Sequence, residues 1–194
     1  MAGEWITRGF DGFRLGTFGN GGQNLYVSCA GILQRVHHMD LDGDGWADLL
    51  ICNSQNHWER PPCYAYLDPF GSGARIEIPS DGSVAGAVCD LNGDGYDDFV
   101  LAMDYNGSRT DLNAFVYYGG PEGLGEQRKI ELPAPQASAV ACGDFNGDGR
   151  PDLAIVCAGK LRLFLQSDLG FEPGRFVDLP IEGGQLAAAD MDGD

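Results

Sequence analysis

Residues 90–100, DLNGDGYDDFV, contain four Asp, one Asn and two Gly within their first nine positions and then turn apolar. The pattern recurs as DLDGDGWADLL from Asp40, DFNGDGRPDLAIV from Asp144 and DMDGD from Asp190. Carboxylates crowded into one short loop repel each other unless a positive charge lies among them. The repeated loop therefore indicates a cation-binding element.

The repeat extends well beyond the acidic loop. The four loops start 50, 54 and 46 residues apart, a period typical of a repeated supersecondary unit. An apolar–acid–apolar–Pro run precedes each of the last three loops, as IEIP (76–79), IELP (130–133) and VDLP (177–180). An apolar run, a second strand-like run and a Gly- and Pro-containing turn follow each complete loop. Each unit thus reads as four short strands joined by tight turns.

The strand that enters each loop has small side chains, as in VAGAVC (84–89), ASAVACG (137–143) and QLAAA (185–189). Small residues suit a strand that is crowded by its equivalents around a shared axis. Four-stranded units of this length arranged radially make a β-propeller. A solenoid is the competing geometry, although its repeats are usually shorter. We therefore expect an all-β fold, and a β-propeller in particular.

The repeat also predicts the domain organisation. Residues 1–31 form an unassigned strand-and-turn remnant, and residues 32–194 carry the repeats. The blades are expected at about 32–80, 83–134 and 137–181, with a partial blade at 184–194. Because typical propellers close with roughly four to eight blades, we expect the chain to be a fragment of a longer propeller.

The loops present alternate oxygen-bearing side chains at positions 1, 3, 5 and 9, counted from the first Asp. Position 7 varies, as expected if only its backbone carbonyl coordinates, and Gly at positions 4 and 6 permits the tight curl. Position 2 is always apolar, as expected for an anchor into the interior. The candidate metal ligands are Asp40, Asp42, Asp44, Trp46, Asp48, Asp90, Asn92, Asp94, Tyr96, Asp98, Asp144, Asn146, Asp148, Arg150, Asp152, Asp190, Asp192 and Asp194.

This donor set favours Ca²⁺, which accepts six to eight oxygens in flexible geometry. Mg²⁺ fits less well because it requires a small octahedral shell, and zinc would call for His or Cys at these positions. An EF-hand or dockerin shares the opening of the motif but needs an acid at position 12 and helical flanks. Position 12 is Ile51, Leu101 and Ile155. The sequence therefore predicts three complete calcium sites and one truncated site between strands.

Amino-acid composition narrows the range of functions that we expect for this chain. The formal net charge is −17, and 21 of the 29 acidic residues are Asp. Nucleic acid and anionic membranes need a basic surface, so neither is expected as a partner. No apolar run is long enough to span a bilayer, and MAGEWITRGF at the N-terminus lacks the apolar core of a signal peptide. The sequence contains no G-x-S-x-G, Walker A or H-E-x-x-H motif, so we expect no enzymatic activity from this segment.

Two further features leave alternatives open. The six cysteines form no Cys-x-x-Cys pair, and Cys52 and Cys63 could meet across a hairpin, although spacing does not establish connectivity. The stretch DYNGSRTD (104–111) mimics an acidic loop but places Ser108 at position 5 and Asp111 at position 8. We expect it to be an ordinary loop between strands. Its Asn106-Gly107-Ser108 is a glycosylation sequon only if the host is eukaryotic and the chain is secreted.

The loops DLNGDGYDDFV and DFNGDGRPDLAIV, together with YYGGPEGL (117–124), resemble FG-GAP/VCBS repeats of the integrin-α-like propeller superfamily over about residues 32–194. Phe70-Gly71 matches the name-giving Phe-Gly only in part, and no Gly-Ala-Pro follows it. The resemblance implies a seven- or eight-bladed propeller with calcium on one rim, usually in secreted or surface proteins. Such domains serve adhesion, ligand binding or scaffolding.

The combined expectation is a non-catalytic binding or adhesion scaffold whose calcium ions are structural. Its partner would be a protein or carbohydrate ligand on a propeller rim, and its location extracellular, at the cell surface or in a bacterial envelope. The alternative is the accessory propeller of a secreted carbohydrate-active or other hydrolytic enzyme.

Overall fold

The computed structural model describes residues 23–27, 33–37, 48–54, 61–67, 74–181 and 184–188. Within these ranges the chain forms β-strands, turns and one short 3-10 turn, η1 (Glu126–Arg128), and it forms no α-helix. Consequently, no helix in the described part of the chain is long and apolar enough to cross a membrane. The predicted all-β class is confirmed.

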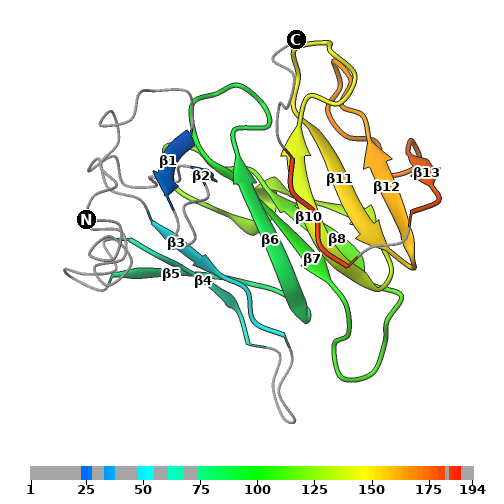
Figure 1. The fold of residues 1–194 in the computed structure, drawn as a ribbon. Helices are drawn as coiled ribbons and strands as arrows, with labels where there is room; N and C mark the ends of the chain where they lie inside the picture. Colours follow the sequence, from blue (N-terminus) through cyan, green and yellow to red (C-terminus); the bar gives the residue numbers. More distant parts are fainter. Residues whose placement is uncertain are drawn as a thin grey trace. The chain divides into compact units, whose positions relative to one another are not determined.

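Two four-stranded antiparallel sheets follow each other along the chain (Figure 1). The first has the order β6-β7-β8-β9 and the second the order β10-β11-β12-β13, so each sheet is a simple meander. Each therefore has the four short strands that the repeat predicts. Their bounds are β6 (Ser83–Cys89), β7 (Asp98–Met103), β8 (Asn113–Tyr117), β9 (Lys129–Pro133), β10 (Ala137–Gly143), β11 (Asp152–Cys157), β12 (Lys160–Phe164) and β13 (Val177–Leu179).

The strands nearer the N-terminus form two smaller sheets. β1 (Gln23–Val27) and β2 (Leu33–His37) pair antiparallel, with Gln23 opposite His37. β3 (Leu49–Ile51), β4 (Cys63–Tyr66) and β5 (Arg75–Ile78) form a three-stranded sheet in chain order. The chain divides into two compact units, residues 1–49 with 65–76 and residues 50–64 with 77–194. The second unit contains both four-stranded sheets.

The core of the second unit lies between its two four-stranded sheets. Every residue of β7 and of β11 is buried, as expected for a strand that is covered on both faces of its sheet. Val100 and Ala102 of β7 join Leu153 and Ile155 of β11 in one hydrophobic cluster. Because alternate residues of a strand point to the same face, this cluster packs one sheet against the next. Each sheet therefore depends on its neighbour for burial.

The strands that enter the acidic loops are closely surrounded. β6 lies alongside β10. A Cβ atom at Gly86 of β6 would lie 2.8 Å from Cys52 Sγ and 2.8 Å from Leu50 Cδ2, so no larger side chain fits there without rearrangement. This confirms the predicted crowding at β6.

The hairpin between β3 and β4 brings Cys52 and Cys63 together, as the sequence allowed. Each thiol affects the ionisation of the other: Cys63 raises the pKa of Cys52, and Cys52 lowers the pKa of Cys63 to about 6. Nearby, Asn53 Nδ2 donates to the Pro62 carbonyl at 2.7 Å. Both cysteines are free thiols in this structure.

The acid of the VDLP run anchors the outermost strand. Asp178 on β13 lies opposite Arg162 on β12 and accepts two hydrogen bonds from its guanidinium, at 2.7 and 2.9 Å. Arg162 also donates to the Pro133 carbonyl at 2.6 Å, so it links β12 to the end of β9, and it stacks over the Phe176 ring with 3.7 Å to the centroid. The hydrogen bonds from Arg162 lower the pKa of Asp178.

We expect Arg162→Ala to lower the free energy of unfolding by about 2–3 kcal/mol, because it leaves a half-buried carboxylate and a carbonyl without their donor. Lys160 lies 3.7 Å from the same carboxylate and its side chain is 57% exposed, so Lys160→Ala should cost less than about 0.5 kcal/mol. Urea unfolding measures both variants.

The Arg162 effect should depend on pH. Since the folded-state pKa of Asp178 is depressed, its contribution to stability is present above the ordinary carboxyl pKa and is lost as the pH falls through the lowered value. The difference between wild type and Arg162→Ala should therefore shrink between about pH 7 and about pH 3. An equal difference at both pH values would show that packing, rather than the ion pair, is responsible.

Candidate metal-binding loops

The acidic loops join the first strand of each sheet to the second. Residues 90–97 connect β6 to β7, and residues 144–151 connect β10 to β11. The described candidate ligands are Asp48 and all those of these two loops, namely Asp90, Asn92, Asp94, Tyr96, Asp98, Asp144, Asn146, Asp148, Arg150 and Asp152. The remaining candidates lie outside the described residues, and these are Asp40, Asp42, Asp44, Trp46, Asp190, Asp192 and Asp194.

The loop at 90–98 is held by its own side chains. Asp90 Oδ1 accepts hydrogen bonds from the backbone N–H groups of Gly93 at 2.7 Å and Asp94 at 3.2 Å, and its Oδ2 accepts from Gly95 at 2.8 Å. Asn92 Oδ1 accepts from the Asp94 N–H at 2.9 Å, and Asp94 Oδ1 accepts from the Tyr96 N–H at 3.0 Å. Successive side chains at alternate positions thus turn towards the inside of the curl.

The loop at 144–152 repeats this arrangement. Asp144 Oδ1 accepts from the N–H groups of Gly147 at 2.7 Å and Asp148 at 3.2 Å, and its Oδ2 accepts from Gly149 at 2.7 Å. These backbone hydrogen bonds, the one from Gly149 first, lower the pKa of Asp144. Asn146 Oδ1 accepts from the Asp148 N–H at 2.9 Å, as Asn92 does from Asp94 in the first loop. Two loops 54 residues apart therefore fold in the same way.

The glycines at positions 4 and 6 have the positive φ that the curl requires. The values are 74° at Gly93 and 86° at Gly95, and 73° at Gly147 and 82° at Gly149. Residues with a Cβ rarely adopt this region. The predicted role of these glycines is confirmed for both described loops.

The Asp at position 9 is the buried anchor of each loop. Asp98 and Asp152 are both 0% exposed. Asp98 Oδ2 accepts from the Leu91 N–H at 2.8 Å, and its Oδ1 accepts from the Gly119 N–H at 2.7 Å. Asp152 bonds in the same way to the N–H groups of Phe145 at 3.0 Å and Gln166 at 2.8 Å. Each carboxylate thus joins its own loop to the turn that follows the third strand of the sheet.

Burial makes the Asp98 carboxylate costly to ionise. The pKa of Asp98 is raised to about 6, mainly by loss of solvation and to a lesser extent by the charges of Asp94 and Asp90, while hydrogen bonds from the N–H groups of Gly119 and Leu91 oppose the change. As the pH rises from the ordinary carboxyl value through about 6, ionisation of this group therefore lowers the stability of the folded chain. A cation near the loop would offset this cost because it favours the charged form.

Position 2 behaves differently in the two loops. Leu91 is 2% exposed and joins the hydrophobic cluster with residues of the following sheet, which confirms the predicted inward anchor. Phe145 is 41% exposed, so the same prediction is wrong at this position. Leu91 shares its cluster with residues of β10, β11 and β12, whereas Phe145 is not among the described members of that cluster.

Position 7 also distinguishes the loops. Tyr96 is 43% exposed, whereas the Arg150 guanidinium forms ion pairs with Asp148 at 2.7 Å and with Asp168 at 3.0 Å. The loop at 144–152 therefore carries its own positive charge on the carboxylate at position 5. The sequence-based interpretation assigned only the backbone carbonyl of Arg150 a role and missed this ion pair.

Within the described residues, no three His, Cys, Asp or Glu side chains converge into a metal-binding group. The oxygens that each loop offers include an amide at position 3 and a backbone carbonyl at position 7, in addition to the carboxylates at positions 1, 5 and 9. This all-oxygen set matches the chemistry of Ca²⁺.

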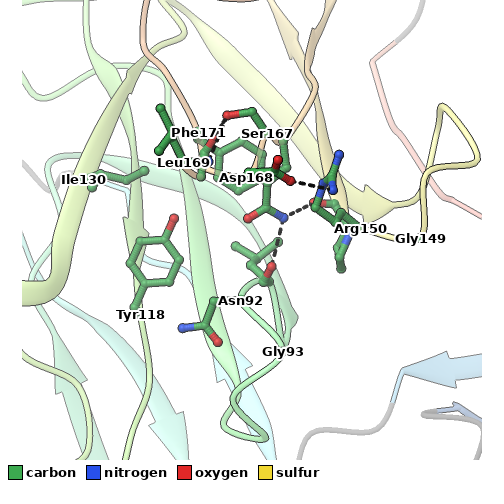
Figure 2. Close-up of a pocket in the computed structure, with 14 residues that line it drawn as sticks. Asn92, Gly93, Tyr118, Ile130, Gly149, Arg150, Ser167, Asp168, Leu169 and Phe171 are labelled. Atoms are coloured by element: carbon green, nitrogen blue, oxygen red, sulfur yellow. Dashed lines mark hydrogen bonds and ion pairs between the residues drawn. The ribbon is translucent and has the colours of Figure 1, made fainter.

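A cavity of about 560 Å³ lies between the two loops. Figure 2 shows Tyr118 and Ile130 on one side of it and Arg150 on the opposite side. Gln166 lines this cavity, and its Nε2 donates to the Leu91 carbonyl at 2.9 Å and to the Pro151 carbonyl at 2.7 Å, so one buried amide connects both loops. No local motif marks Gln166, because its partner Leu91 is 75 residues away.

The stretch at 104–111 is an ordinary connection between β7 and β8, as expected. Asn106 is 6% exposed, and its Oδ1 accepts from the N–H groups of Ser108 at 3.1 Å and Arg109 at 2.9 Å. Its Nδ2 donates to Asp81 at 2.8 Å. The amide nitrogen of the sequon is therefore buried and used within the fold, which disfavours glycosylation in the folded state.

Comparison with protein families matches the FG-GAP-like repeat at residues 40–101, 90–155 and 144–194. These three overlapping matches each start at the first Asp of a loop and together span the chain from Asp40 to its last residue. The chain therefore belongs to the FG-GAP-like repeat family, which confirms the resemblance carried by the acidic loops.

The curated relatives include integrin alpha subunits. The chain is 26% identical over 155 residues to integrin alpha-PS5 of Drosophila melanogaster, and this match covers 65% of the chain and 15% of the relative. It is 28% identical over 146 residues to integrin alpha-IIb of Homo sapiens, covering 62% of the chain and 14% of the relative. The chain thus spans about one seventh of the length of these two proteins.

We expect Asp152→Ala to lower the free energy of unfolding by about 2–3 kcal/mol in the presence of a chelator, because it leaves the buried N–H groups of Phe145 and Gln166 without an acceptor. Asp152→Asn keeps one of the two acceptor oxygens, so its free energy of unfolding should fall by about half as much. Asp148→Ala, in the exposed part of the same loop, should lose less than about 1 kcal/mol. Urea unfolding in EGTA measures the series. A loss at Asp148 as large as that at Asp152 would contradict the anchoring role.

Proposed function

We propose that the chain is part of a calcium-stabilised β-propeller that acts as a non-catalytic binding or adhesion scaffold. The observation that carries the proposal is the common fold of the loops at 90–98 and 144–152, which turn the same oxygen-bearing residues inward at the same places in consecutive sheets. The propeller is supported by two four-stranded meanders whose first strands lie side by side and whose faces share one core.

In this proposal each loop holds one calcium ion. The carboxylates at positions 1, 5 and 9, the Asn or Asp at position 3 and the backbone carbonyl at position 7 would be the ligands, and the ion would neutralise their mutual repulsion. The loops at 40–48 and from Asp190 carry the same residue pattern, and we extend the proposal to them. The ions would be structural, because ligation by so many protein oxygens leaves no open position for chemistry.

The binding role rests on the family and on its relatives. The chain matches proteins named integrin alpha, and the family resemblance implies adhesion or ligand binding at a propeller rim. A protein or carbohydrate ligand and an extracellular, cell-surface or bacterial-envelope location follow from the same resemblance. Binding of the immobilised chain to purified matrix proteins and to a glycan panel, with and without Ca²⁺, tests the scaffold role. Hydrolysis of a glycan during that assay would instead favour the accessory propeller of an enzyme.

We expect Ca²⁺ to raise the melting temperature of the chain relative to EGTA, because it binds the folded loops only. At a hundredfold excess over the dissociation constant, linkage predicts about 2.7 kcal/mol of stabilisation for each site. Asp94→Asn should weaken binding at its loop by at least about tenfold, since it removes a ligand charge. Asp111→Asn, in the non-binding loop at 104–111, is the matched control and should bind as wild type does. An unchanged melting temperature in Ca²⁺ would overturn the calcium proposal.

The two described loops should differ in affinity. Arg150, at position 7 of the loop at 144–152, pairs its positive charge with the carboxylate at position 5. Position 7 of the loop at 90–98 is Tyr96, which carries no such charge. We expect Arg150→Gln to tighten calcium binding at 144–152 several-fold and Tyr96→Arg to weaken it at 90–98, because a nearby cation repels Ca²⁺. Isothermal titration at low and high salt measures both, and both effects should diminish at high salt. Weaker calcium binding in Arg150→Gln together with tighter binding in Tyr96→Arg would show that a positive charge at position 7 does not compete with Ca²⁺.

A further inference from the structure

The structure places the Asn-Gly pairs of the sequence in two different environments. The four pairs are Asn20-Gly21, Asn92-Gly93, Asn106-Gly107 and Asn146-Gly147, of which the first lies outside the described residues. An Asn followed by Gly is chemically labile, because the backbone nitrogen of the next residue can attack the side-chain carbonyl carbon and Gly has no Cβ to hinder the approach. The two reacting atoms belong to adjacent residues, so covalent connectivity keeps them within reach of each other. The fold decides only whether the amide is free to make the remaining movement.

Two of the described pairs are exposed, at positions 3 and 4 of the acidic loops. Asn92, Gly93, Asn146 and Gly147 all face solvent. A Cβ atom at Gly93 or Gly147 would meet nothing within 4 Å, so the backbone at the reacting bond has open space beside it. Each Asn side chain bonds to the exposed Asp two residues ahead, which belongs to the same loop. These amides can therefore move without disturbing the core.

The hydrogen bonds of these loops also favour the attack. The Gly93 N–H donates to Asp90 Oδ1 at 2.7 Å, so a carboxylate lies next to the proton that must leave the attacking nitrogen. Asn92 Oδ1 accepts from the Asp94 N–H at 2.9 Å, and this donor stabilises the negative charge that the attack places on that oxygen. The loop at 144–152 has both hydrogen bonds at the same distances.

The third described pair is held firmly by the fold. Asn106 is 6% exposed. Its Oδ1 accepts from the Ser108 N–H at 3.1 Å, the Ser108 hydroxyl at 3.0 Å and the Arg109 N–H at 2.9 Å. Its Nδ2 donates at 2.8 Å to Asp81, which is 25 residues away in the sequence. Attack on this amide requires a local opening that breaks all these hydrogen bonds.

We propose that Asn92 and Asn146 are sites of spontaneous deamidation in the folded chain, and that the fold protects Asn106. The Gly nitrogen forms a bond to the Asn side-chain carbonyl carbon and loses its proton. The bond from that carbon to the amide nitrogen breaks, and the amide nitrogen takes up a proton and leaves as ammonia, which yields a cyclic succinimide. Water adds to one of the two ring carbonyls and opens the ring to Asp or to isoaspartate. One water is consumed, one ammonia is released, and nothing is oxidised or reduced.

Peptide mapping of the wild-type chain tests the proposal, and Asn106 is its internal control. Cleavage before Asp places Asn92 in peptide 90–93, Asn106 in 104–110 and Asn146 in 144–147. Conversion to Asp creates a new cleavage site within a peptide, whereas conversion to isoaspartate leaves the peptide uncut and heavier. The folded chain is held in EGTA at mildly alkaline pH, where the nitrogen loses its proton more readily, and a second sample is held in urea.

In the folded sample we expect Asn92 and Asn146 to be converted, and Asn106 to be converted at least about tenfold more slowly. In urea the three residues should react at similar rates, because the hydrogen bonds that protect Asn106 are lost. Methylation of the intact protein by an isoaspartate-specific methyltransferase is a second readout, and it should increase with time of incubation. An Asn92 or Asn146 that stays intact in the folded chain while the urea sample reacts, or that reacts as slowly as Asn106, would overturn the proposal.

The modification has a consequence that rests on the proposed calcium sites, although the reaction itself does not. The Asp product carries a carboxylate at position 3, as Asp42 and Asp192 do in the other loops, whereas isoaspartate inserts an extra carbon into the backbone of the curl. A bound calcium ion would hold the position 3 side chain as a ligand, so Ca²⁺ in place of EGTA should slow conversion at Asn92 and Asn146 but not at Asn106. Equal rates in Ca²⁺ and EGTA would contradict calcium binding at these loops and leave the deamidation result standing.

Discussion

Each four-stranded sheet depends on one buried Asp carboxylate at position 9 of its acidic loop. Asp98 and Asp152 are fully enclosed, and each uses both oxygens to accept backbone N–H groups, one from its own loop and one from the turn after the third strand. A buried charge is tolerated only when it is well hydrogen-bonded. The same residue therefore shapes the acidic loop and holds the turn that follows the third strand of the sheet.

The second constraint is that the two four-stranded sheets share one core. β7 and β11 are buried on both faces, and their alternating side chains meet in a cluster common to two sheets. Polar side chains also join the two four-stranded sheets. Gln166 connects the loops of consecutive sheets through the Leu91 and Pro151 carbonyls, and Arg162 connects β12 to the end of β9. Repeated units of this kind are stable only when neighbours cover each other, which agrees with the family to which the chain belongs.

Much of the loop could be predicted because its interactions are local. Asp90 and Asp144 bond to N–H groups three to five residues ahead, and glycines at two fixed positions supply the positive φ. The predictions that failed concerned the burial of one loop side chain and the bonding partners of another. Phe145 shares the pattern of Leu91 but is 41% exposed, and Arg150 pairs with Asp148 through a side chain at a position that the motif leaves variable.

The all-β class, the four-stranded repeat, the family and the curl of the acidic loops can all be inferred from the amino-acid sequence, because each follows from contacts within a few residues or from a pattern repeated about every 50 residues. Two long-range contacts, from Asp98 to Gly119 and from Gln166 to Leu91, emerge only when the chain is folded. These pairs are 21 and 75 residues apart. Packing of one strand or sheet on the next brings them together, and no local spacing records that packing.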